Sequence, residues 1–273
     1  MKKRIELAGS WALLTGASAG IGKALAFELA ERGTNLVIVA RNRDRLRDCA
    51  EAVTAKHGVS VRVVAADLET PSGVKAMLDE VDALGVEIEH VINNAGFGGS
   101  GPSQMLPFDH LQRMTDLNCT SVVLITQHYL KRFCERDRGG FVQIASTAGF
   151  LPVPFMAVYG ATKAYVLNYS VAVAEELAAS NVRMTAVCPG PVPTEFQQRA
   201  GYQLTGMQAQ NAVSAEKVAR DSVKAYLRGS NVCIPGRVNQ LQMWGQRFLS
   251  LSARAKAAAV VMRKSGRDKV GVS

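Results

Sequence analysis

The stretch WALLTGASAGIG, from Trp11 to Gly22, indicates the first structural elements of this chain and the class of its fold. Its apolar first half predicts a short buried β-strand at 10–15, and its glycines predict a tight turn that opens a helix over 20–32. Glycines let the backbone approach a pyrophosphate closely, and the free N–H groups and positive dipole of a helix N-terminus hold its charge. A glycine-rich turn alone is a weak signal, but its position between a strand and a helix favours a dinucleotide-binding loop.

The rest of the chain repeats this order of strand and helix as far as Ile234. Short apolar, β-branched runs predict strands at 10–15, 35–40, 60–65, 90–93, 140–145, 182–187 and 231–234. Longer amphipathic stretches predict helices near 20–32, 43–57, 71–84, 108–136, 158–179 and 214–228. The alternation is typical of an α/β fold: a single Rossmann-like domain, with a doubly wound parallel sheet of about seven strands and helices on both faces. We expect this domain over residues 1–235 and a helical C-terminal extension over 236–273.

The composition is that of a globular protein. Of the 273 residues, 48% are hydrophobic and 20% are charged, which excludes a disordered chain. The five cysteines are scattered without CxxC spacing, so neither a disulfide framework nor a metal site is expected, and a reducing cytoplasm fits best. The basic start at residues 1–4 resembles the opening of a signal peptide, but Glu6 follows, and no run reaches the roughly 18 apolar residues that span a bilayer.

The net charge of +9 lies at the two ends of the chain. Residues 229–273 carry eight Lys or Arg and one acidic residue, and residues 2–4 are all basic, which leaves 21 basic and 22 acidic residues in 5–228. A near-neutral body supplies no continuous basic face, and no recognised nucleic-acid-reading module is present. A nucleic-acid partner is therefore not expected, and the surplus charge concerns the termini.

The ends of the second, third and fourth strands indicate which dinucleotide binds. A dinucleotide fold places the residue that meets the adenosine ribose after the second strand, where an acid accepts hydrogen bonds from a free 2′-hydroxyl. Here that residue is Arg41, whose guanidinium suits a 2′-phosphate, so NADPH is favoured over NADH; the alternative is a solvated arginine at a helix start. Asp67 and Leu68 end the third strand and are placed to meet the adenine, and NNAG at 93–96 ends the fourth.

Three side chains that come later in the chain than the fourth strand are the candidates for acid–base catalysis. Ser146 ends the fifth strand, and Tyr159 and Lys163 are four residues apart on the next helix, hence neighbours on one face. A phenol has a pKa of about 10, and a nearby ammonium favours its ionised form. Ser146 can donate a hydrogen bond to a carbonyl oxygen while Tyr159 delivers a proton to it. Singly, each residue has an ordinary structural interpretation, and a YxxxK pair occurs often by chance.

Together these motifs resemble the short-chain dehydrogenase/reductase family over about residues 8–235. The matching segments are TGASAGIG at 15–22, NNAG at 93–96, Asn118, Ser146, YGATK at 159–163 and PGPVPT at 189–194. The resemblance implies that Ser146 orients the substrate carbonyl and that Tyr159 is the general acid, or the base in the oxidative direction. It also implies that Lys163 binds the nicotinamide ribose and that Asn118 holds a water linking Lys163 to solvent.

The resemblance implies a cofactor site that uses the glycine-rich loop, the strand ends and the segment after the sixth strand. Its expected members are Thr15, Gly16, Ser18, Gly20, Ile21, Gly22, Arg41, Asp67, Leu68, Asn94, Ala95, Gly96, Tyr159, Lys163, Pro189, Gly190, Val192 and Thr194. Val192 would offer backbone groups to the carboxamide. The family's other marker of NADP(H) preference, a basic residue inside the loop, is absent, since Ala19 stands before Gly20. NADP(H) is therefore expected, and NAD(H) stays open.

The expected substrate pocket is apolar. Phe97, Phe150, Leu151 and Phe196 are its candidate lining residues, although Phe150 and Leu151 could equally be packing residues. An apolar lining suggests an oxoacyl, steroid-like or aromatic ketone, and the ARN turn at 40–42 and the long tail resemble the ketoacyl reductases and 17β-hydroxysteroid-dehydrogenase-like enzymes of lipid metabolism. The expected function is an NADPH-dependent carbonyl reductase acting on a small hydrophobic molecule or an acyl thioester. An oxidative NAD-dependent alcohol or hydroxysteroid dehydrogenase and a cofactor-bound membrane-surface or regulatory binding protein are the alternatives.

The C-terminal tail carries an apolar stripe. Leu241, Trp244, Phe248, Leu251 and Ala255 share one face if the segment is one helix, with Arg247 and Arg254 beside it. Such a helix could dock over the substrate cleft or at a subunit edge, lie on an anionic membrane as a peripheral contact, or attract an acidic carrier such as acyl carrier protein or the phosphates of coenzyme A. A homodimer or homotetramer is expected through the long helices at 108–136 and 158–179.

Overall fold

A seven-stranded parallel sheet forms the centre of the computed structural model, which describes residues 4–268. The strands are β1 (Trp11–Thr15), β2 (Asn35–Ala40), β3 (Val61–Ala65), β4 (Ile88–Asn93), β5 (Gly140–Ile144), β6 (Arg183–Val187) and β7 (Val232–Cys233). Their order is β3-β2-β1-β4-β5-β6-β7, so the direction of winding reverses between β1 and β4. In open sheets of this kind, ligands bind outside the carboxyl ends of the strands at that reversal. The α/β fold expected from the alternating pattern is confirmed.

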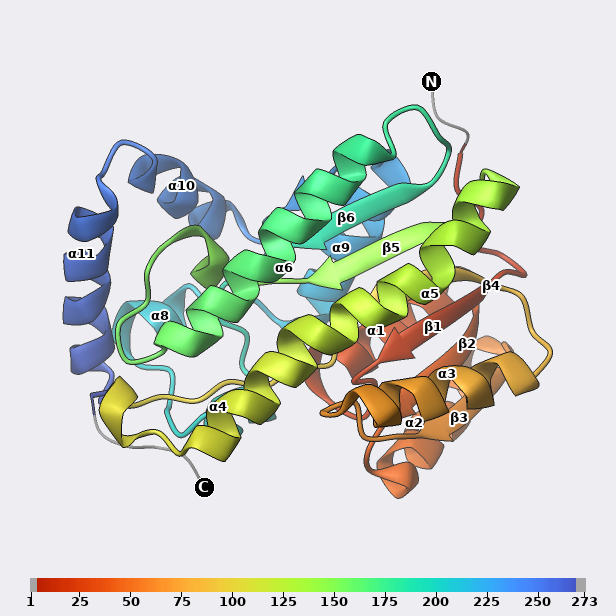
Figure 1. Ribbon diagram of the computed structural model, residues 1–273, viewed down its shortest axis with the longest axis horizontal. Helices are drawn as coiled ribbons and strands as arrows, with labels where there is room; N and C mark the ends of the chain where they lie inside the picture. The colour runs from red at the N-terminus through yellow and green to blue at the C-terminus, as the bar shows by residue number, and fades with distance from the viewer. Residues whose placement is uncertain (1–3, 269–273) are drawn as a thin grey trace.

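Helices cover both faces of the sheet. They include α1 (Gly20–Ala30), α2 (Arg43–His57), α3 (Pro71–Ala83), α5 (Ser121–Arg136), α6 (Ala157–Glu176) and α9 (Ala215–Arg228). Figure 1 shows α3, α5 and α6 in front of the sheet and α1 and α9 behind it. Adjacent strand residues point to opposite faces, so Leu14 packs in the core cluster with Leu25 of α1, while Leu13 packs in the cluster with Ile125 of α5. Strands β1 and β2, in the middle of the sheet, are mostly apolar because both of their faces are buried.

The helix expected at 108–136 is divided into three parts. The parts are α4 (Phe108–Thr115), a π-helical turn labelled η2 (Asp116–Thr120), and α5. A π-turn inserts one extra residue into a helix and often marks a functional position. Here its buried residue Asn118 is held by the backbone of Phe97, so a long-range contact accompanies the irregularity.

Short elements shape the loops at the carboxyl ends of the strands. They are η1 (Ser103–Met105), η3 (Thr147–Phe150), α7 (Glu195–Arg199) and α8 (Gly206–Gln210). The long helices α5 and α6 also leave Leu124, Tyr165 and Val171 between 38% and 47% exposed. The homodimer or homotetramer expected through these helices stays a prediction.

The C-terminal extension is two helices, α10 (Arg237–Gln246) and α11 (Leu251–Lys264), so the expectation of one continuous apolar stripe is wrong. Ser250 has extended backbone and its hydroxyl accepts a hydrogen bond from the Ala253 N–H, which starts a new helix there. Leu241, Trp244, Phe248 and Leu251 are 61% to 76% exposed. Figure 1 shows α10 and α11 at the end of the molecule toward which the strands point. No helix within residues 4–268 is long and apolar enough to cross a membrane.

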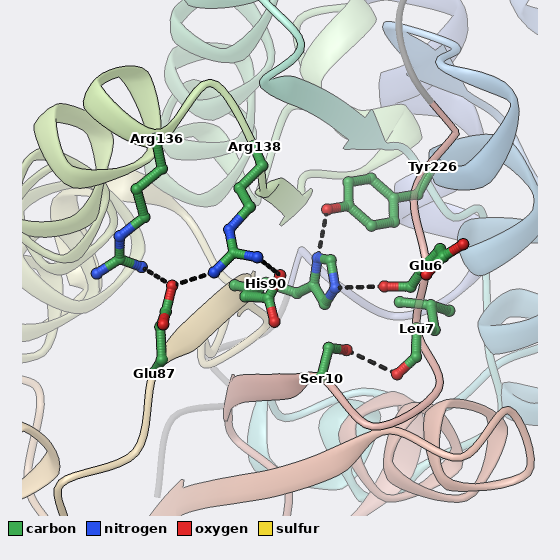
Figure 2. Close-up of polar contacts among 9 residues, drawn as sticks. Glu6, Leu7, Ser10, Glu87, His90, Arg136, Arg138 and Tyr226 are labelled. Carbon is green, nitrogen blue, oxygen red and sulfur yellow. Dashed lines mark hydrogen bonds and ion pairs between the residues drawn. The ribbon is translucent and has the colours of Figure 1, made fainter.

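A polar cluster at the start of β4 joins the N-terminal segment to the sheet (Figure 2). His90 Nδ1 lies 2.8 Å from the Tyr226 hydroxyl of α9, and its Nε2 lies 3.3 Å from the carbonyl oxygen of Glu6. On the edge of the cluster, Arg136 and Arg138 form ion pairs with Glu87. Burial lowers the pKa of His90 to about 4, so its ring is neutral at pH 7. This cluster is structural and lies away from the carboxyl ends of the strands.

Candidate functional site

One cavity of about 960 Å³ opens at the carboxyl ends of the strands. Its wall runs from the glycine-rich loop, past the ends of β2, β3, β4 and β5, to the C-terminal helices. Thr15, Asn118 and Phe150 are the expected site residues that do not line it; all the others do. The cavity therefore brings the two halves of the expected site, cofactor and substrate, into one continuous space.

The glycine-rich loop has the geometry of a phosphate cradle. The helix α1 begins after Ala19 without a side-chain cap, so the first N–H groups of α1 remain available for an anion. A Cβ on Gly16, whose φ is +68°, would lie 2.7 Å from Asn94 Nδ2, and a Cβ on Gly22 would lie 2.7 Å from the carbonyl carbon of Gly16. Only glycine allows this close packing of loop, helix and strand. The residues present fit a dinucleotide pyrophosphate.

Thr15 and Asn94 brace this loop from behind. The N–H groups of Asn94 and Ala95 both donate to Thr15 Oγ1 at 3.0 Å. The Asn94 amide nitrogen donates to the carbonyl oxygens of Thr15 and Gly16 at 2.9 and 3.1 Å. The sequence placed these residues at the cofactor, and the structure shows that their polar side-chain groups hold the two loops together.

Arg41 lies at the adenosine end of the cavity. Its Nη1 lies 2.7 Å from Glu69 Oε1, and Arg113 of α4 lies 3.4 Å from the other oxygen of the same carboxylate. Glu69 is buried, whereas the Arg41 side chain is 59% exposed. The buried carboxylate thus holds one nitrogen of a guanidinium that lines the cavity. Arg113 and Glu69 were not expected from the sequence, because their meeting depends on how α4 lies relative to the loop that follows β3.

The segment after β6 closes over the cofactor half. Thr194 caps α7 by accepting from the Phe196 N–H, and its methyl group lies where a Cβ on Gly20 would approach to 3.2 Å. A Cβ on Gly190 would lie 2.5 Å from Asn239 Oδ1, so α10 packs directly on this segment. Asn239 is 2% exposed and was missed, since nothing in its local sequence distinguishes it from other helical asparagines.

Ser146 and Tyr159 meet at the floor of the cavity. Ser146 has extended backbone at the start of η3, and its Oγ accepts from the Ala148 N–H at 3.1 Å. Burial raises the pKa of Tyr159, the nearby Tyr202 raises it further, and the hydrogen bond with Ser146 and the charge of Arg267 act in the opposite direction. The phenol therefore holds its proton at neutral pH, and the direction of the pKa shift is opposite to the lowering expected from Lys163.

Lys163 is buried one helical turn from Tyr159. Its Nζ donates to the carbonyl oxygen of Ile144 at 2.8 Å and lies 5.9 Å from the centroid of the Tyr159 ring. Burial lowers the pKa of Lys163 to about 8, with the Cys119 and Cys188 thiols acting in the opposite direction. The ammonium is therefore charged through most of the neutral range and loses its proton at mildly alkaline pH.

Asn118 holds the loop that follows β4 against α6. Its Oδ1 accepts from the Phe97 N–H at 3.1 Å, and its Nδ2 donates to the Phe97 carbonyl at 2.9 Å and to Thr162 Oγ1 at 3.0 Å. A Cβ on Gly96 would lie 2.9 Å from Asn118 Oδ1 and 3.5 Å from Lys163 Nζ, so glycine lets the two side chains approach the same backbone. The water-holding role of Asn118 stays a prediction, and the described contacts make it a positioning residue.

The substrate half of the cavity is apolar on most sides. Phe97, Leu151 and Phe196 line it, and the Phe196 ring lies 5.4 Å from that of Tyr159. Phe150 instead packs against the core cluster that includes Val166, and its carbonyl accepts from Arg254, so its expected place in the pocket is wrong. Successive residues of a tight turn point in different directions, and the sequence could not decide whether Phe150 or Leu151 faces the cavity.

The C-terminal extension supplies much of this half. Its lining residues include Leu241, Met243, Leu249, Ala257, Val261, Met262 and Arg267. Docking over the cleft, one of the alternatives for the tail, is therefore what the structure shows. Tyr202 lines the cavity from the segment after the sixth strand. Arg267 also lines it and was not expected there, because it comes from a segment without a recognisable motif.

Comparison with known proteins gives consistent matches. A model of the family described as "short chain dehydrogenase" matches residues 10–204. The very-long-chain 3-oxoacyl-CoA reductase of Pyricularia oryzae is 35% identical over 182 residues, which cover 64% of this chain and 54% of that protein. The human 17-beta-hydroxysteroid dehydrogenase type 3 is 36% identical over 195 residues, covering 71% of this chain and 62% of that protein. The matches thus span little more than half of these relatives.

Two solved structures are similar over nearly the whole chain. A short-chain dehydrogenase from Sphingobium yanoikuyae in complex with NADPH is 30% identical, covers 95% of this chain and 96% of its own, and superposes with a TM-score of 0.77. A structure described in a study of 7beta-hydroxysteroid dehydrogenase stereoselectivity has a TM-score of 0.85, with 95% and 100% of the two chains covered. At 23% identity, the second shows the shared fold alone.

Proposed function

The chain belongs to the short-chain dehydrogenase family, and from this premise we propose that it is an NADPH-dependent carbonyl reductase. Its substrate is a hydrophobic ketone of oxoacyl, steroid-like or aromatic type. The observation that carries the proposal is the meeting of Ser146, Tyr159 and Lys163 in the same cavity as the glycine-rich loop. A dinucleotide on that loop would extend toward these side chains, and a ketone in the apolar half would lie beside both.

Side chains of the protein donate the proton and stabilise the charge that its transfer leaves. Tyr159 lines the cavity and is protonated at neutral pH, so its hydroxyl can transfer a proton to a carbonyl oxygen as negative charge develops there. Ser146 adds a second hydroxyl at the same point and can donate a hydrogen bond to the oxygen. The bound nicotinamide supplies the hydride that reaches the carbonyl carbon. Lys163, fixed by Ile144, presents a positive charge that stabilises the phenolate left after transfer.

The charges at the adenosine end support NADPH as the cofactor. Arg41 and Arg113 share one buried carboxylate, Glu69, so these three side chains together carry a charge of +1. A 2′-phosphate adds negative charge at that point, and a guanidinium can form charge-assisted hydrogen bonds to it. One solved relative binds NADPH, and another similar structure is in complex with NAD, so the preference must be measured.

Substitution of Tyr159 tests the reaction. Tyr159→Phe keeps the ring packed on Phe196 and removes only the proton donor, so turnover of an aromatic or alicyclic ketone should fall by about 10² to 10⁴-fold. NADPH affinity should stay within about twofold, measured by quenching of protein fluorescence. Tyr165→Phe, on the exposed side of the same helix, is the matched control and should behave as the wild type. Wild-type turnover by Tyr159→Phe would overturn the proposal.

Substitution of Arg41 tests the cofactor. In Arg41→Ala, the dissociation constant for NADPH should rise by roughly tenfold or more, since a charge-assisted hydrogen bond contributes about 1.5–3 kcal/mol, while that for NADH changes little. Arg43→Ala, two residues further along, is the matched control. An equal loss for both cofactors would show that Arg41 does not distinguish them.

A further inference from the structure

The chain reverses direction after α11 and returns into the substrate half of the cavity. Gly266 has φ +72°, its N–H donates to the Arg263 carbonyl, and the Arg267 N–H donates to the Met262 carbonyl at 3.1 Å. This is a helix C-cap that glycine adopts at no steric cost. It turns Arg267 inward, where the residue is 3% exposed and lines the cavity.

The surroundings of the Arg267 guanidinium are apolar or neutral. Its Cζ lies 3.6 Å from the centroid of the Tyr202 ring, and its Nη1 lies 2.7 Å from the Met262 sulfur. Its Nε is buried without a hydrogen-bond partner, and within residues 4–268 no carboxylate forms an ion pair with it. Burial lowers the pKa of Arg267, as expected for a positive charge that lacks a counter-ion.

The acidic residues that line the cavity are already engaged elsewhere. Glu69 is paired with two arginines at the adenosine end, and Glu195 is paired with Arg45 and Arg199. Asp67 ends β3, and its carboxylate accepts from the Glu69 N–H. Since an unpaired buried charge costs several kcal/mol, the counter-ion that suits Arg267 is one that a ligand brings.

We propose that Arg267 binds a carboxylate carried by the substrate, so the preferred substrate is a hydrophobic ketone with a carboxylate at some distance from the reacting carbonyl. This inference rests on the proposed reductase function and names its substrate class. Arg267 acts electrostatically on both Tyr202 and Tyr159, which places its charge in the same half of the cavity as the proton donor. A ketone at Tyr159 and a carboxylate at Arg267 can therefore belong to one molecule.

The chemistry of the pocket favours a carboxylate over a phosphate. A guanidinium presents a planar fork of N–H donors that matches two carboxylate oxygens, and the free Nε is part of that fork. One guanidinium balances the single charge of a carboxylate. A phosphate dianion would keep one uncompensated charge beside Met262 and the Tyr202 ring, which are the neighbours of the guanidinium and carry no positive charge.

The test compares a keto acid with its methyl ester. A series of aryl and alicyclic keto acids with increasing separation between the two groups is assayed by NADPH oxidation, each beside its ester. For the best spacing, wild-type kcat/KM should favour the acid by roughly 10- to 100-fold, the range expected for a charge-assisted hydrogen bond. Arg267→Met should lower this ratio at least tenfold, and Arg267→Lys should keep part of it. Lys264→Met, which removes an exposed charge from the same segment, is the matched control and should keep the wild-type ratio.

A binding measurement separates this inference from the reaction itself. A carboxylic acid of the same skeleton without the ketone should bind wild type in the presence of NADPH at least tenfold more tightly than Arg267→Met, by isothermal titration calorimetry. Equal affinities, or a wild-type enzyme that reduces acid and ester equally well, would overturn the carboxylate site and leave the proposed reductase intact. Binding of the acid without turnover of any ketone would overturn the reductase and leave the site. A preference for an oxoacyl-CoA over a neutral thioester that is lost in Arg267→Met would also overturn the assignment, in favour of a phosphate.

Discussion

Gly22 is the position where one methyl group should damage the site most directly. A Cβ there would overlap the Gly16 carbonyl oxygen and lie 2.5 Å from Asn94 Nδ2, both of which are fixed parts of the loop. Ordinary carbon contacts need about 3.5 Å, so in Gly22→Ala the helix and the loop must separate by about 1 to 1.4 Å. The Asn94 amide then loses its hydrogen bonds to Thr15 and Gly16.

The loss can be estimated from these contacts. Two hydrogen bonds at about 1 kcal/mol each and an overpacking cost of about 1–3 kcal/mol predict a fall of about 3–5 kcal/mol in the free energy of unfolding. A displacement of about 1 Å in the loop that meets the pyrophosphate should also weaken NADPH binding by at least about tenfold. Urea unfolding and a fluorescence titration with NADPH measure the two effects.

The matched control is Gly245→Ala, a helical glycine with nothing within 4 Å of the added Cβ. It should keep wild-type affinity for NADPH and a similar or slightly higher stability, because alanine favours the helix. If Gly22→Ala unfolds at the wild-type urea concentration and binds NADPH normally, the loop is not packed as described, and the cradle argument fails.

Three further predictions concern the rest of the molecule. His90 has a pKa of about 4 in the folded protein against 6.5 in the unfolded chain. The free energy of unfolding should therefore be highest above pH 6.5 and fall by up to about 3 kcal/mol as the pH drops toward 4. In urea titrations His90→Gln should make the free energy of unfolding less dependent on pH, and an unchanged dependence would refute this prediction. Asn118→Ala removes both hydrogen bonds to the part-buried backbone of Phe97 and should cost about 2–4 kcal/mol of unfolding free energy, whereas a cost below about 0.5 kcal/mol would show that the π-turn holds without it. The exposed Trp244 and Phe248, near basic residues, should bind vesicles containing anionic phosphatidylserine, and Trp244→Ser with Phe248→Ser should abolish co-sedimentation; equal sedimentation of both proteins would exclude this surface.

The candidate catalytic residues show which features of the site can be predicted from local sequence patterns. Ser146, Tyr159 and Lys163 could be assigned because a strand end and an i, i+4 spacing are local, and the sheet topology then brings those positions together. Their protonation behaviour could not be assigned in the same way. Burial raises the pKa of Tyr159 and lowers that of Lys163, and burial depends on every segment packed over the site.

The C-terminal extension shows a feature that a local sequence pattern predicted incorrectly. Its apolar spacing suggested a single helix, but a serine cap at Ser250 and contacts of Arg254 with the Arg247, Leu249 and Phe150 carbonyls divide it in two. A periodic pattern does not exclude a break when the residues at the break can satisfy the freed backbone groups. The extension that results is part of the substrate wall.

The sequence by itself determined the order of strands and helices, the glycine-rich loop, the family resemblance and which side chains are candidates for the reaction. These follow from residue spacing along a strand, a turn or a helix, which a short segment specifies alone. Only the tertiary structure decided that Phe150 faces the core, that Asn239 packs on Gly190, and that Arg267 returns to the cavity with no counter-ion among residues 4–268. Each of these depends on the meeting of segments far apart in the chain, and the WALLTGASAGIG stretch that specifies the fold contains no information about them.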